Sequence, residues 1–362
     1  MPSELELCRA HPQEYIKKIA ALDLPEVNLM EVCGTHTMAI AKAGLRAMLP
    51  PNVHLLSGPG CPVCVTPAEV IDEILKLAGR PDVVIATYGD MIRVPGSRRG
   101  WNLGKMKASG SRVEVVYSPV DALDLAAKNP EKKIVFLGVG FETTAPGTAA
   151  SVLLAEERGV SNYYVFSMLK TVEPALRTLI ADPEFNVQGF LCPGHVAVIT
   201  GEKGFSFLPE EYGIPAVISG FEPEDILLSV YKLLLQIHEK RPRLENTYTR
   251  AVAPEGNPLA ESFMDKVLAR ESDLWRGLGE IPESALMLRP AFSRHDAKLA
   301  FGVSYKASEG TGICRCGDVI QGRLSPAACP LFGKACTPED PYGPCMVSSE
   351  GTCAAAYKYQ EV

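Results

Sequence analysis

The sequence predicts an α/β fold: two similar lobes, each built on a parallel β-sheet, followed by an irregular and helical cysteine-rich domain. Three observations support this prediction. Between residues 27 and 240, short apolar segments alternate with amphipathic helical segments, a pattern typical of a parallel sheet covered on both faces. Six of the eleven cysteines lie within residues 314–362, among glycines and prolines. The chain of 362 residues also exceeds the usual size of a single core.

The expected elements follow one another in strand–helix order. We expect strands at residues 27–33, 53–58, 82–89, 112–118, 132–140, 162–169, 187–194 and 214–220. The helices between them are expected at 35–49, 67–79, 120–128, 148–159, 172–182 and 224–240. After residue 241 the alternation ends, and one short helix at 259–269 precedes the cysteine-rich tail.

These elements suggest three units. The first lobe spans residues 27–118 and the second spans 119–240. Each contains strands that end in a polar or cysteine-containing motif before a helix, which suggests a duplication with the lobes meeting at their loop edges. Residues 241–362 form the third unit, which we expect to be an iron–sulfur domain packed with the N-terminal segment 1–26.

The composition argues against several classes of protein. A hydrophobic content of 46% and a charged content of 22% are ordinary for a folded globular chain. The net charge of −7 argues against nucleic acid as the main partner. We see neither a membrane-length apolar run nor a secretory signal, and therefore expect a cytoplasmic protein. In a reducing compartment, eleven cysteines favour metal ligation, catalysis or reversible redox chemistry over structural disulfides.

The tail itself predicts an iron–sulfur site. A 4Fe–4S cluster needs four thiolates that converge from a sharply turning chain, and glycine and proline provide the turns. The candidate thiols are Cys314, Cys316, Cys329, Cys336, Cys345 and Cys353.

Two further cysteine motifs lie where a strand ends and a helix begins, which is where parallel sheets place ligands. Cys33, in CGTH, is a candidate nucleophile or soft-metal ligand; we expect the helix start to lower its pKa and His36 to pair with it. The alternative is a buried cysteine beside a capping threonine. Cys61 and Cys64 form a CxxC that suits either a reversible disulfide or half of a zinc site. We find no second CxxC or close histidine pair nearby, which favours the redox function.

Two motifs are less specific. GVGFETTAPGTA lacks the third glycine of a dinucleotide loop. Its Glu142, Thr143 and Thr144 are expected to bind a small anion, to order the opposite loop, or simply to cap a helix. Cys192 and His195, in CPGH, are expected either to support the site from behind its ligands or to pack in the core.

Taken together, these motifs resemble the HypD family of [NiFe]-hydrogenase maturation factors. They are CGTH at 33–36, GPGCPVC at 58–64, GFETTAPGTA at 140–149, CPGH at 192–195 and the terminal cysteines, and they cover nearly the whole chain. The cluster signature of that family, with 14, 6 and 16 residues between successive ligands, matches Cys314, Cys329, Cys336 and Cys353. For the spare pair, Cys316 and Cys345, the resemblance implies a disulfide near the cluster.

The resemblance also implies a role: building the Fe(CN)₂CO unit of the hydrogenase active site. It implies that the protein works with HypC, through which it serves the hydrogenase large subunit, and with HypE, on which the HypE–HypF system delivers cyanide as a thiocyanate. Cys33 would then bind the iron alongside a HypC cysteine, with His36 assisting. Cys61 and Cys64 would exchange electrons with the cluster, either reducing the cyanide carrier or protecting the site.

Two alternative functions stay open at the level of sequence. The first is a thiol oxidoreductase of the ferredoxin–thioredoxin reductase type, which shares a cluster and a CxxC but gives no account of CGTH. The second is a non-catalytic scaffold stabilised by zinc. Whether the protein turns over as an enzyme does not follow from the sequence.

Overall fold

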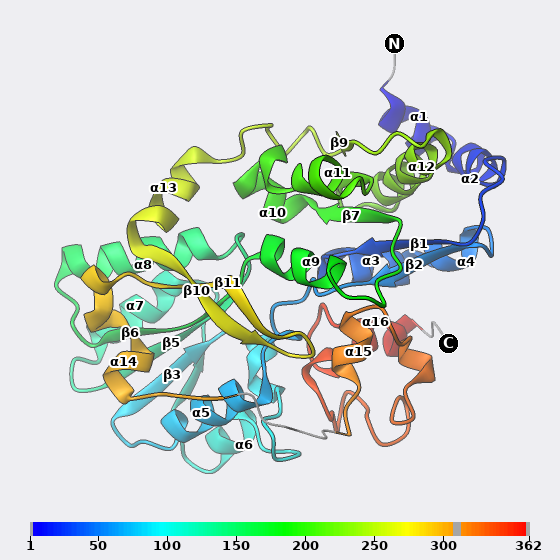
Figure 1. Ribbon diagram of the computed structural model, residues 1–362. Coiled ribbons are helices and arrows are strands. Elements are labelled where there is room, and N and C mark those ends of the chain that lie inside the picture. Colours follow the sequence, from blue (N-terminus) through cyan, green and yellow to red (C-terminus); the bar gives the residue numbers. More distant parts are fainter. Residues whose placement is uncertain (1–2, 307–312, 360–362) are drawn as a thin grey trace.

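The computed structural model describes residues 3–306 and 313–359, and it confirms the α/β class with two separate parallel sheets (Figure 1). Sheet A has the order β2-β1-β7-β8-β9, with β1 at Val27–Glu31, β2 at Val53–Ser57, β7 at Gly189–Pro193, β8 at Ala216–Ser219 and β9 at Leu244–Asn246. Sheet B has the order β4-β3-β5-β6, with β3 at Val83–Thr87, β4 at Val113–Val115, β5 at Lys133–Gly140 and β6 at Tyr163–Leu169. Within each sheet all neighbouring strands are parallel.

The sheets do not follow the expected division at residue 118. The segment 27–118 supplies β1 and β2 to sheet A and β3 and β4 to sheet B, and the segment 119–240 also supplies two strands to each. The chain crosses from sheet A to sheet B after β2 and returns after β6. Alternating apolar segments identify strands, but they carry no information on which strands pair, so this division was not visible in the sequence.

The two sheets nevertheless share one connectivity. If the strands of each sheet are numbered in chain order, both begin with the spatial order 2-1-3-4. In such sheets the direction of winding reverses between the first and third strands, and the crevice outside their carboxyl ends is the usual ligand site. The two reversal points fall between β1 and β7 in sheet A and between β3 and β5 in sheet B. The shared order supports the expectation of two similar parallel-sheet units, although each unit takes strands from both expected segments.

Helices cover both sheets and end at ordinary signals, such as the left-handed Gly44 after α3 and Gly159 after α8. Those near sheet A are α3 (Gly34–Ala43), α4 (Leu45–Met48), α10 (Gly194–Thr200), η2 (Glu202–Gly204), α11 (Phe207–Tyr212) and α12 (Pro223–Glu239). Those near sheet B are η1 (Gly89–Arg93), α5 (Ala68–Ala78), α6 (Leu103–Ala108), α7 (Pro119–Lys128), α8 (Ala145–Arg158), α13 (Pro258–Val267), η3 (Pro290–His295) and α14 (Ala297–Phe301). Helix α9 (Val172–Ile180) lies between the sheets.

The N-terminal segment packs against sheet A, which corrects the expectation that it packs with the third unit. Helices α1 (Glu4–Ala10) and α2 (Pro12–Ala20) lie along α12. Tyr15 and Ile19 are buried in the same apolar cluster as the α12 residues, and the ring of Tyr15 meets Tyr231 edge to face at 5.4 Å. The amphipathic pattern of α2 therefore finds its partner in the longest helix of the chain.

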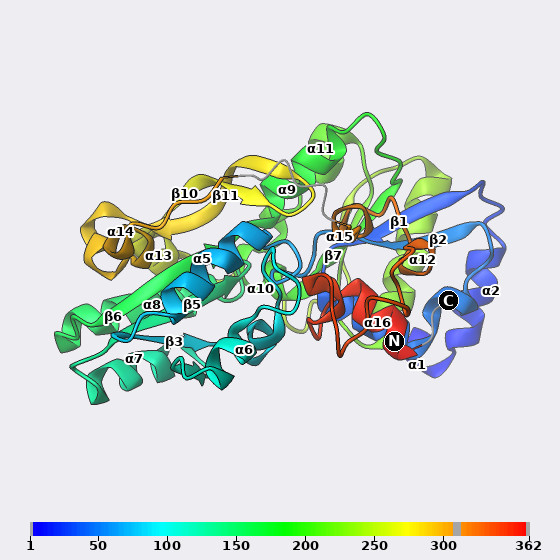
Figure 2. The same ribbon diagram turned by 90° about the horizontal axis from the view of Figure 1, so that it is seen from below.

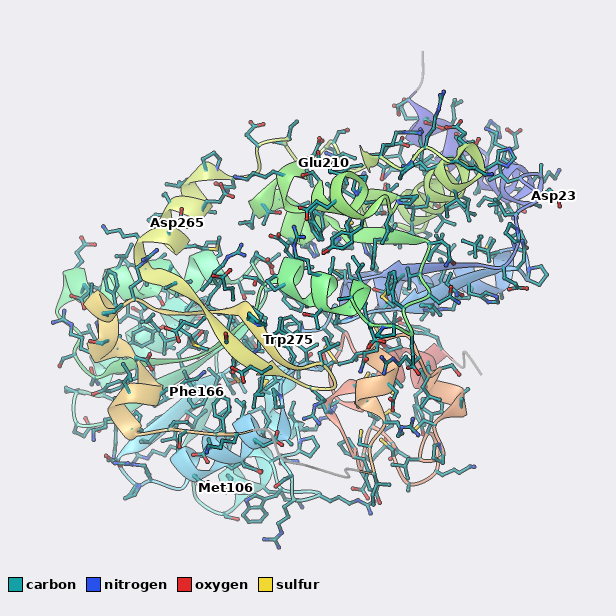
Figure 3. The ribbon with its side chains drawn as sticks, in the orientation of Figure 1. Asp23, Met106, Phe166, Glu210, Asp265 and Trp275 are labelled. Atoms are coloured by element: carbon teal, nitrogen blue, oxygen red, sulfur yellow. A yellow bond between two sulfur atoms is a disulfide. The ribbon has the colours of Figure 1, made fainter. Side chains whose placement is uncertain are left out.

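An antiparallel hairpin, β10 (Leu268–Trp275) and β11 (Gly279–Leu288), was not anticipated from the sequence. It packs on β6 and α9 and reaches from sheet B towards the cysteine-rich segment (Figure 1). Trp275, labelled in Figure 3, stacks on Phe141 at 6.0 Å and donates from Nε1 to the Ser284 hydroxyl at 2.8 Å. The expected helix at 259–269 is present as α13, so the unexpected element begins directly after it.

A buried ion pair fastens this hairpin. The Lys170 ammonium, which follows β6, lies 2.6 Å from Asp273 Oδ2 and donates to the Leu274 carbonyl at 2.9 Å. Both side chains are less than a tenth exposed. Tyr305 donates to the other carboxylate oxygen of Asp273 at 3.0 Å. The hydrogen bonds thus satisfy both charges in the interior.

The cysteine-rich segment, residues 313–359, is irregular apart from short helices, as expected. These are α15 (Cys316–Ile320), η4 (Pro326–Ala328), η5 (Pro344–Met346) and α16 (Thr352–Tyr359). Figures 1 and 2 place it on the sheet A side, and α16 contacts α3. Arg99 pairs with Asp340, and Arg323 pairs with Asp182. No helix among the described residues is long and apolar enough to cross a membrane.

Replacing Asp273 by Asn should destabilise the protein by about 3–5 kcal/mol, because it leaves the buried Lys170 ammonium without its counter-charge. Glu271→Gln, in the exposed part of the same strand, should change the free energy of unfolding by less than about 0.5 kcal/mol. Urea denaturation followed by circular dichroism measures both. Equal effects of the two substitutions would show that the ion pair does not fasten the hairpin.

Candidate functional site

A cleft of about 280 Å³ lies where the carboxyl ends of both sheets converge. Segments that follow five strands line it, together with one residue of the cysteine-rich segment. After the sheet A strands these are Val32, Cys33 and Thr35, then Gly60, Pro62 and Val63, then Pro193, His195 and Val196; after the sheet B strands they are Tyr88–Met91 and Val139–Phe141 with Thr143 and Thr144; and Glu350 completes the wall. Both reversal points of the sheets therefore open into one cleft.

Cys33 stands at the start of α3 with an extended backbone. Its N–H donates to Glu31 Oε2 at 3.0 Å, and the next N–H, of Gly34, donates to the Gly60 carbonyl at 3.0 Å. A Cβ on Gly60 would lie 2.1 Å from the Cys33 nitrogen, so glycine alone fits there. Cys33 is 8% exposed. The loop after β2 is thus pressed against the loop after β1, which sets the place of the thiol.

The expected lowering of the Cys33 pKa is wrong. Burial, followed by the nearby Glu350 carboxylate, raises the pKa of this thiol to about 12. Backbone N–H groups of His36 and Thr35, at the helix start, act in the predicted direction but are outweighed. In the absence of a cation, Cys33 is therefore a protonated thiol.

His36 does not pair with Cys33, which corrects a second expectation. The imidazole is fully buried, its Nε2 lies 2.9 Å from the Gly220 carbonyl, and its ring packs on Phe221 at 4.7 Å. Its Nδ1 is buried without a hydrogen-bond partner in the described part of the chain. Burial lowers the pKa of His36 to about 4, so the ring is neutral near pH 7.

His195 lines the cleft and stacks at 3.9 Å on Phe221, the same ring that packs on His36. Burial lowers its pKa as well. Cys192, one residue before the end of β7, is fully buried, and its thiol lies 3.9 Å from the Phe190 carbonyl. The core alternative holds for Cys192, whereas His195 reaches the site.

The structure adds three carboxylates that sequence reasoning missed. Glu31 is buried beneath Cys33, accepts from Thr37, and has its pKa raised by burial to about 7. Glu350 accepts from the Thr35 hydroxyl at 2.8 Å, and burial raises its pKa. The third is Asp90. The available sequence signals were an acidic residue inside an apolar strand, MEVC, and one following a strand end, YGD.

Asp90 joins the cleft to the cysteine-rich segment. Its Oδ2 accepts from the Ser349 N–H at 2.8 Å, from the Ser349 hydroxyl at 2.7 Å and from the Ser348 hydroxyl at 3.2 Å. Asp90 follows a strand of sheet B, and Glu350 contacts α3 beside sheet A. The segment 348–350 therefore connects the two sheets at the cleft.

Cys61 and Cys64 form a disulfide in the structure. Both are buried, and the Cys61 sulfur lies 3.4 Å from the Ser348 hydroxyl oxygen. The Cys64 N–H donates to the Cys61 sulfur at 3.1 Å. The disulfide therefore stands between the loop that holds Cys33 and the cysteine-rich segment.

The GFETT motif divides its residues between two cavities. Thr143 and Thr144 line the cleft, whereas Glu142 turns away from it into a larger cavity of about 570 Å³ beside α13. One oxygen of Glu142 accepts from the Val172 N–H at 2.9 Å, and the other is buried without a hydrogen-bond partner among the described residues. Burial raises the pKa of Glu142 to about 7. Glu142 thus holds the start of α9, and its expected ordering of the opposite loop stays a prediction.

The four thiols selected by their spacing, Cys314, Cys329, Cys336 and Cys353, line one small apolar cavity with Cys316, Leu331, Phe332 and Met346. In the described ranges no three potential ligands are close enough to hold a single metal ion. The thiolates of a 4Fe–4S cluster can lie further apart than the ligands of a single ion, because each thiolate binds a different iron. Hydrogen bonding to Cys316, and burial, raise the pKa of Cys314. The positive charge of an iron core would favour the deprotonated form of these closely spaced thiols. The four sulfur donors therefore fit a cluster.

Cys316 and Cys345 are free thiols here, in contact with each other within this group. The Cys353 N–H also points to the Cys345 sulfur at 3.4 Å. Gly343 has no room for a side chain, because a Cβ there would lie 2.5 Å from the Cys314 sulfur and 2.7 Å from that of Cys316. A disulfide between Cys316 and Cys345 stays a prediction.

Comparison with known proteins gives a single family. Residues 10–360 match the model of the HypD family, described as the hydrogenase formation hypA family. The chain is 45% identical to the hydrogenase maturation factor HypD of Rhodobacter capsulatus over 347 residues, which covers 94% of this chain and 92% of that protein. It is 43% identical to the protein of the same name from Escherichia coli (strain K12) over 336 residues, with coverages of 92% and 90%.

The buried carboxyl of Glu142, with only one oxygen hydrogen-bonded, predicts a pH effect on stability. With a pKa near 7 in the folded chain and about 4.5 when unfolded, the folded state binds more protons, so stability is lost as pH rises from 4.5 through 7. Glu142→Gln should therefore be more stable than the wild type by roughly 3 kcal/mol at pH 8 and similar to it below pH 4.5. Denaturant titrations across this pH range test it. A difference that is independent of pH would contradict the assigned pKa.

Proposed function

Since the chain belongs to the HypD family of hydrogenase maturation factors, we propose that it assembles the Fe(CN)₂CO unit of the [NiFe]-hydrogenase active site. The observation that carries the proposal is the cleft lined by Cys33 and Glu350, with the Cys61–Cys64 disulfide in the loop that forms one of its walls and in contact with the cysteine-rich segment. Assembly of an iron–cyanide unit requires a soft ligand for iron and a supply of electrons, and the cleft brings candidates for both together.

In this proposal the iron is cargo and Cys33 is its ligand. A thiolate is a soft donor suited to low-spin iron. The burial that keeps the free thiol protonated is overcome when a metal cation displaces the proton, as in other thiolate sites. Burial raises the pKa of Glu31 and Glu350 beside the same position, so both carboxyls would release protons and add negative charge once a cation is bound there. The exposed side of the cleft, lined by Thr143, Thr144 and His195, is where a HypC cysteine would complete the iron site. Transfer of the iron towards the hydrogenase large subunit would take place from the same side.

The CxxC pair would supply the electrons for cyanide release. A thiocyanate on HypE and the reduced pair balance as R–SCN plus two Cys–SH giving R–SH, HCN and the Cys61–Cys64 disulfide. Two electrons and two protons leave the thiols, and the S–C bond of the carrier breaks. The alternative role, protecting the site, requires the same pair. Buried free thiols at the cysteine-rich cavity need a reducing compartment, so we place this activity in the cytoplasm.

Cys314, Cys329, Cys336 and Cys353 would hold a 4Fe–4S cluster. When bound, such a cluster supplies single electrons. The chain contributes a short physical connection: Ser348 touches the Cys61 sulfur and lies three residues from Cys345, whose sulfur accepts from the Cys353 N–H. This connection supports a route for returning the disulfide to its dithiol form.

A thiol oxidoreductase acting on a partner's disulfide is the competing function, because it would use the same disulfide and cysteine-rich segment. It leaves unexplained the close packing of Gly60 and Gly34 that buries Cys33 at the floor of the cleft. A zinc-stabilised scaffold is separated by iron and sulfide analysis, since zinc brings no acid-labile sulfide.

Serine in place of Cys314, Cys329, Cys336 or Cys353 should lower bound iron and bleach the visible absorbance, because a hydroxyl is a poor substitute for a thiolate at iron. Serine at Cys316 or Cys345, which belong to the same group of thiols but lie outside the predicted ligand set, is the matched control and should leave iron content unchanged. Full cluster content in any of the first four variants would remove that residue from the ligand set.

Cys33→Ala should keep the fold and the cluster but abolish the infrared bands of CO and cyanide in the complex with HypC, because the iron loses its ligand. Cys8→Ala, a buried cysteine on α1, is the control and should retain them. Wild-type band intensity in Cys33→Ala would place the iron elsewhere, with Cys61 and Cys64 as the next candidates.

A further inference from the structure

The turn of the hairpin between β10 and β11 rests directly on the cysteine-rich segment. Gly277 faces Gly317 so closely that a Cβ on Gly277 would lie 2.5 Å from the Gly317 Cα. Gln321 of the same segment donates to the Gly277 carbonyl at 2.7 Å. Gly317 follows Cys316, so the residue before Gly277, Arg276, is brought beside the cysteine cavity.

Arg276 is also held by the segment that follows the redox disulfide. Its backbone N–H donates to the Val65 carbonyl at 2.8 Å, and its Nε donates to the Thr66 carbonyl at 3.0 Å. These two carbonyls belong to the residues directly after Cys64. One side chain therefore touches the disulfide loop and approaches the predicted cluster ligands.

The guanidinium of Arg276 is incompletely satisfied. Its Nη2 is buried and has no hydrogen-bond partner in the part of the chain that the structure describes. Within those same residues no carboxylate lies within 4.0 Å of it, whereas Arg315 and Arg323 of the neighbouring segment are each paired. The guanidinium lies close enough to Cys314 and Cys316 to act electrostatically on both sulfurs. A buried, unpaired donor next to thiols is costly unless an anion accepts from it.

We propose that Arg276 is a positioning residue for the iron–sulfur cluster, placing a partly buried positive charge and a buried, free N–H beside it and so favouring its reduced form. The inference rests on the proposed function, because it requires the cluster. A 4Fe–4S core with four thiolates carries net negative charge, which grows when one electron converts [4Fe–4S]²⁺ to [4Fe–4S]⁺. Nearby charge and hydrogen bonds to the sulfurs are among the factors that set the potential of such clusters.

The test is a potentiometric titration of the purified full-length protein with dithionite, the electron donor, followed by electron paramagnetic resonance of the reduced cluster. Arg276→Gln should bind as much iron and sulfide as the wild type and be at least tenfold harder to reduce, a fall in potential of 59 mV or more. Arg276→Lys keeps the charge and should shift the potential less than Arg276→Gln does. Lys334→Gln removes an exposed charge two residues before Cys336 and should leave the potential unchanged, because solvent screens it.

The outcomes separate the inference from the function on which it rests. A wild-type potential in Arg276→Gln with intact iron would overturn the inference alone, as would equal shifts in Arg276→Gln and Lys334→Gln. Loss of iron from both Arg276→Gln and Arg276→Lys would also overturn it, because Arg276 would then be needed for assembly rather than for potential. A wild-type protein that binds no iron and sulfide after anaerobic reconstitution would refute both.

Discussion

The site depends on a close contact between backbones at the carboxyl edge of sheet A. Gly60 and Gly34 have no space for a side chain: a Cβ on Gly60 would lie 2.1 Å from the Cys33 nitrogen, and one on Gly34 would lie 2.3 Å from the Glu350 Cβ. This contact brings the loop after β1, the loop after β2 and the cysteine-rich segment together. Every other feature of the cleft, including the burial of Cys33 and the position of the disulfide, follows from it.

Electrostatics gives the cleft its second property. Burial raises the pKa of Cys33, Glu31 and Glu350 together, so the metal-free protein favours the protonated forms at the place where a cation would be favourable. His36 and His195 carry no compensating positive charge, since burial lowers the pKa of both. The site is therefore suited to accept a positively charged cargo and release protons as it does so.

The sequence predicted the chemistry-bearing positions better than their surroundings. The α/β class, the strand ends and the placement of the cysteine motifs at them came from local patterns, which report burial and chain reversal directly. The assignment of strands to sheets could not be predicted, because pairing is a long-range property. The pKa of Cys33 and the orientation of His36 were predicted wrongly. The prediction used only their position at the start of one helix, whereas distant residues such as Glu350 and Gly220 surround them in the fold. Glu350 belongs to a segment hundreds of residues from Cys33 in sequence, and Arg276 belongs to the hairpin that was not predicted. Neither position could therefore be derived from local patterns.

The central claim is that the cysteine-rich segment and the Cys61–Cys64 disulfide are one connected redox site. The most direct measurement is the state of that disulfide, determined by alkylation and peptide mass spectrometry after anaerobic photoreduction with a one-electron donor. The account predicts free thiols at Cys61 and Cys64 in the cluster-loaded protein and an intact disulfide in a Cys329→Ser variant that lacks the cluster. Equal reduction of the disulfide in both proteins would contradict it.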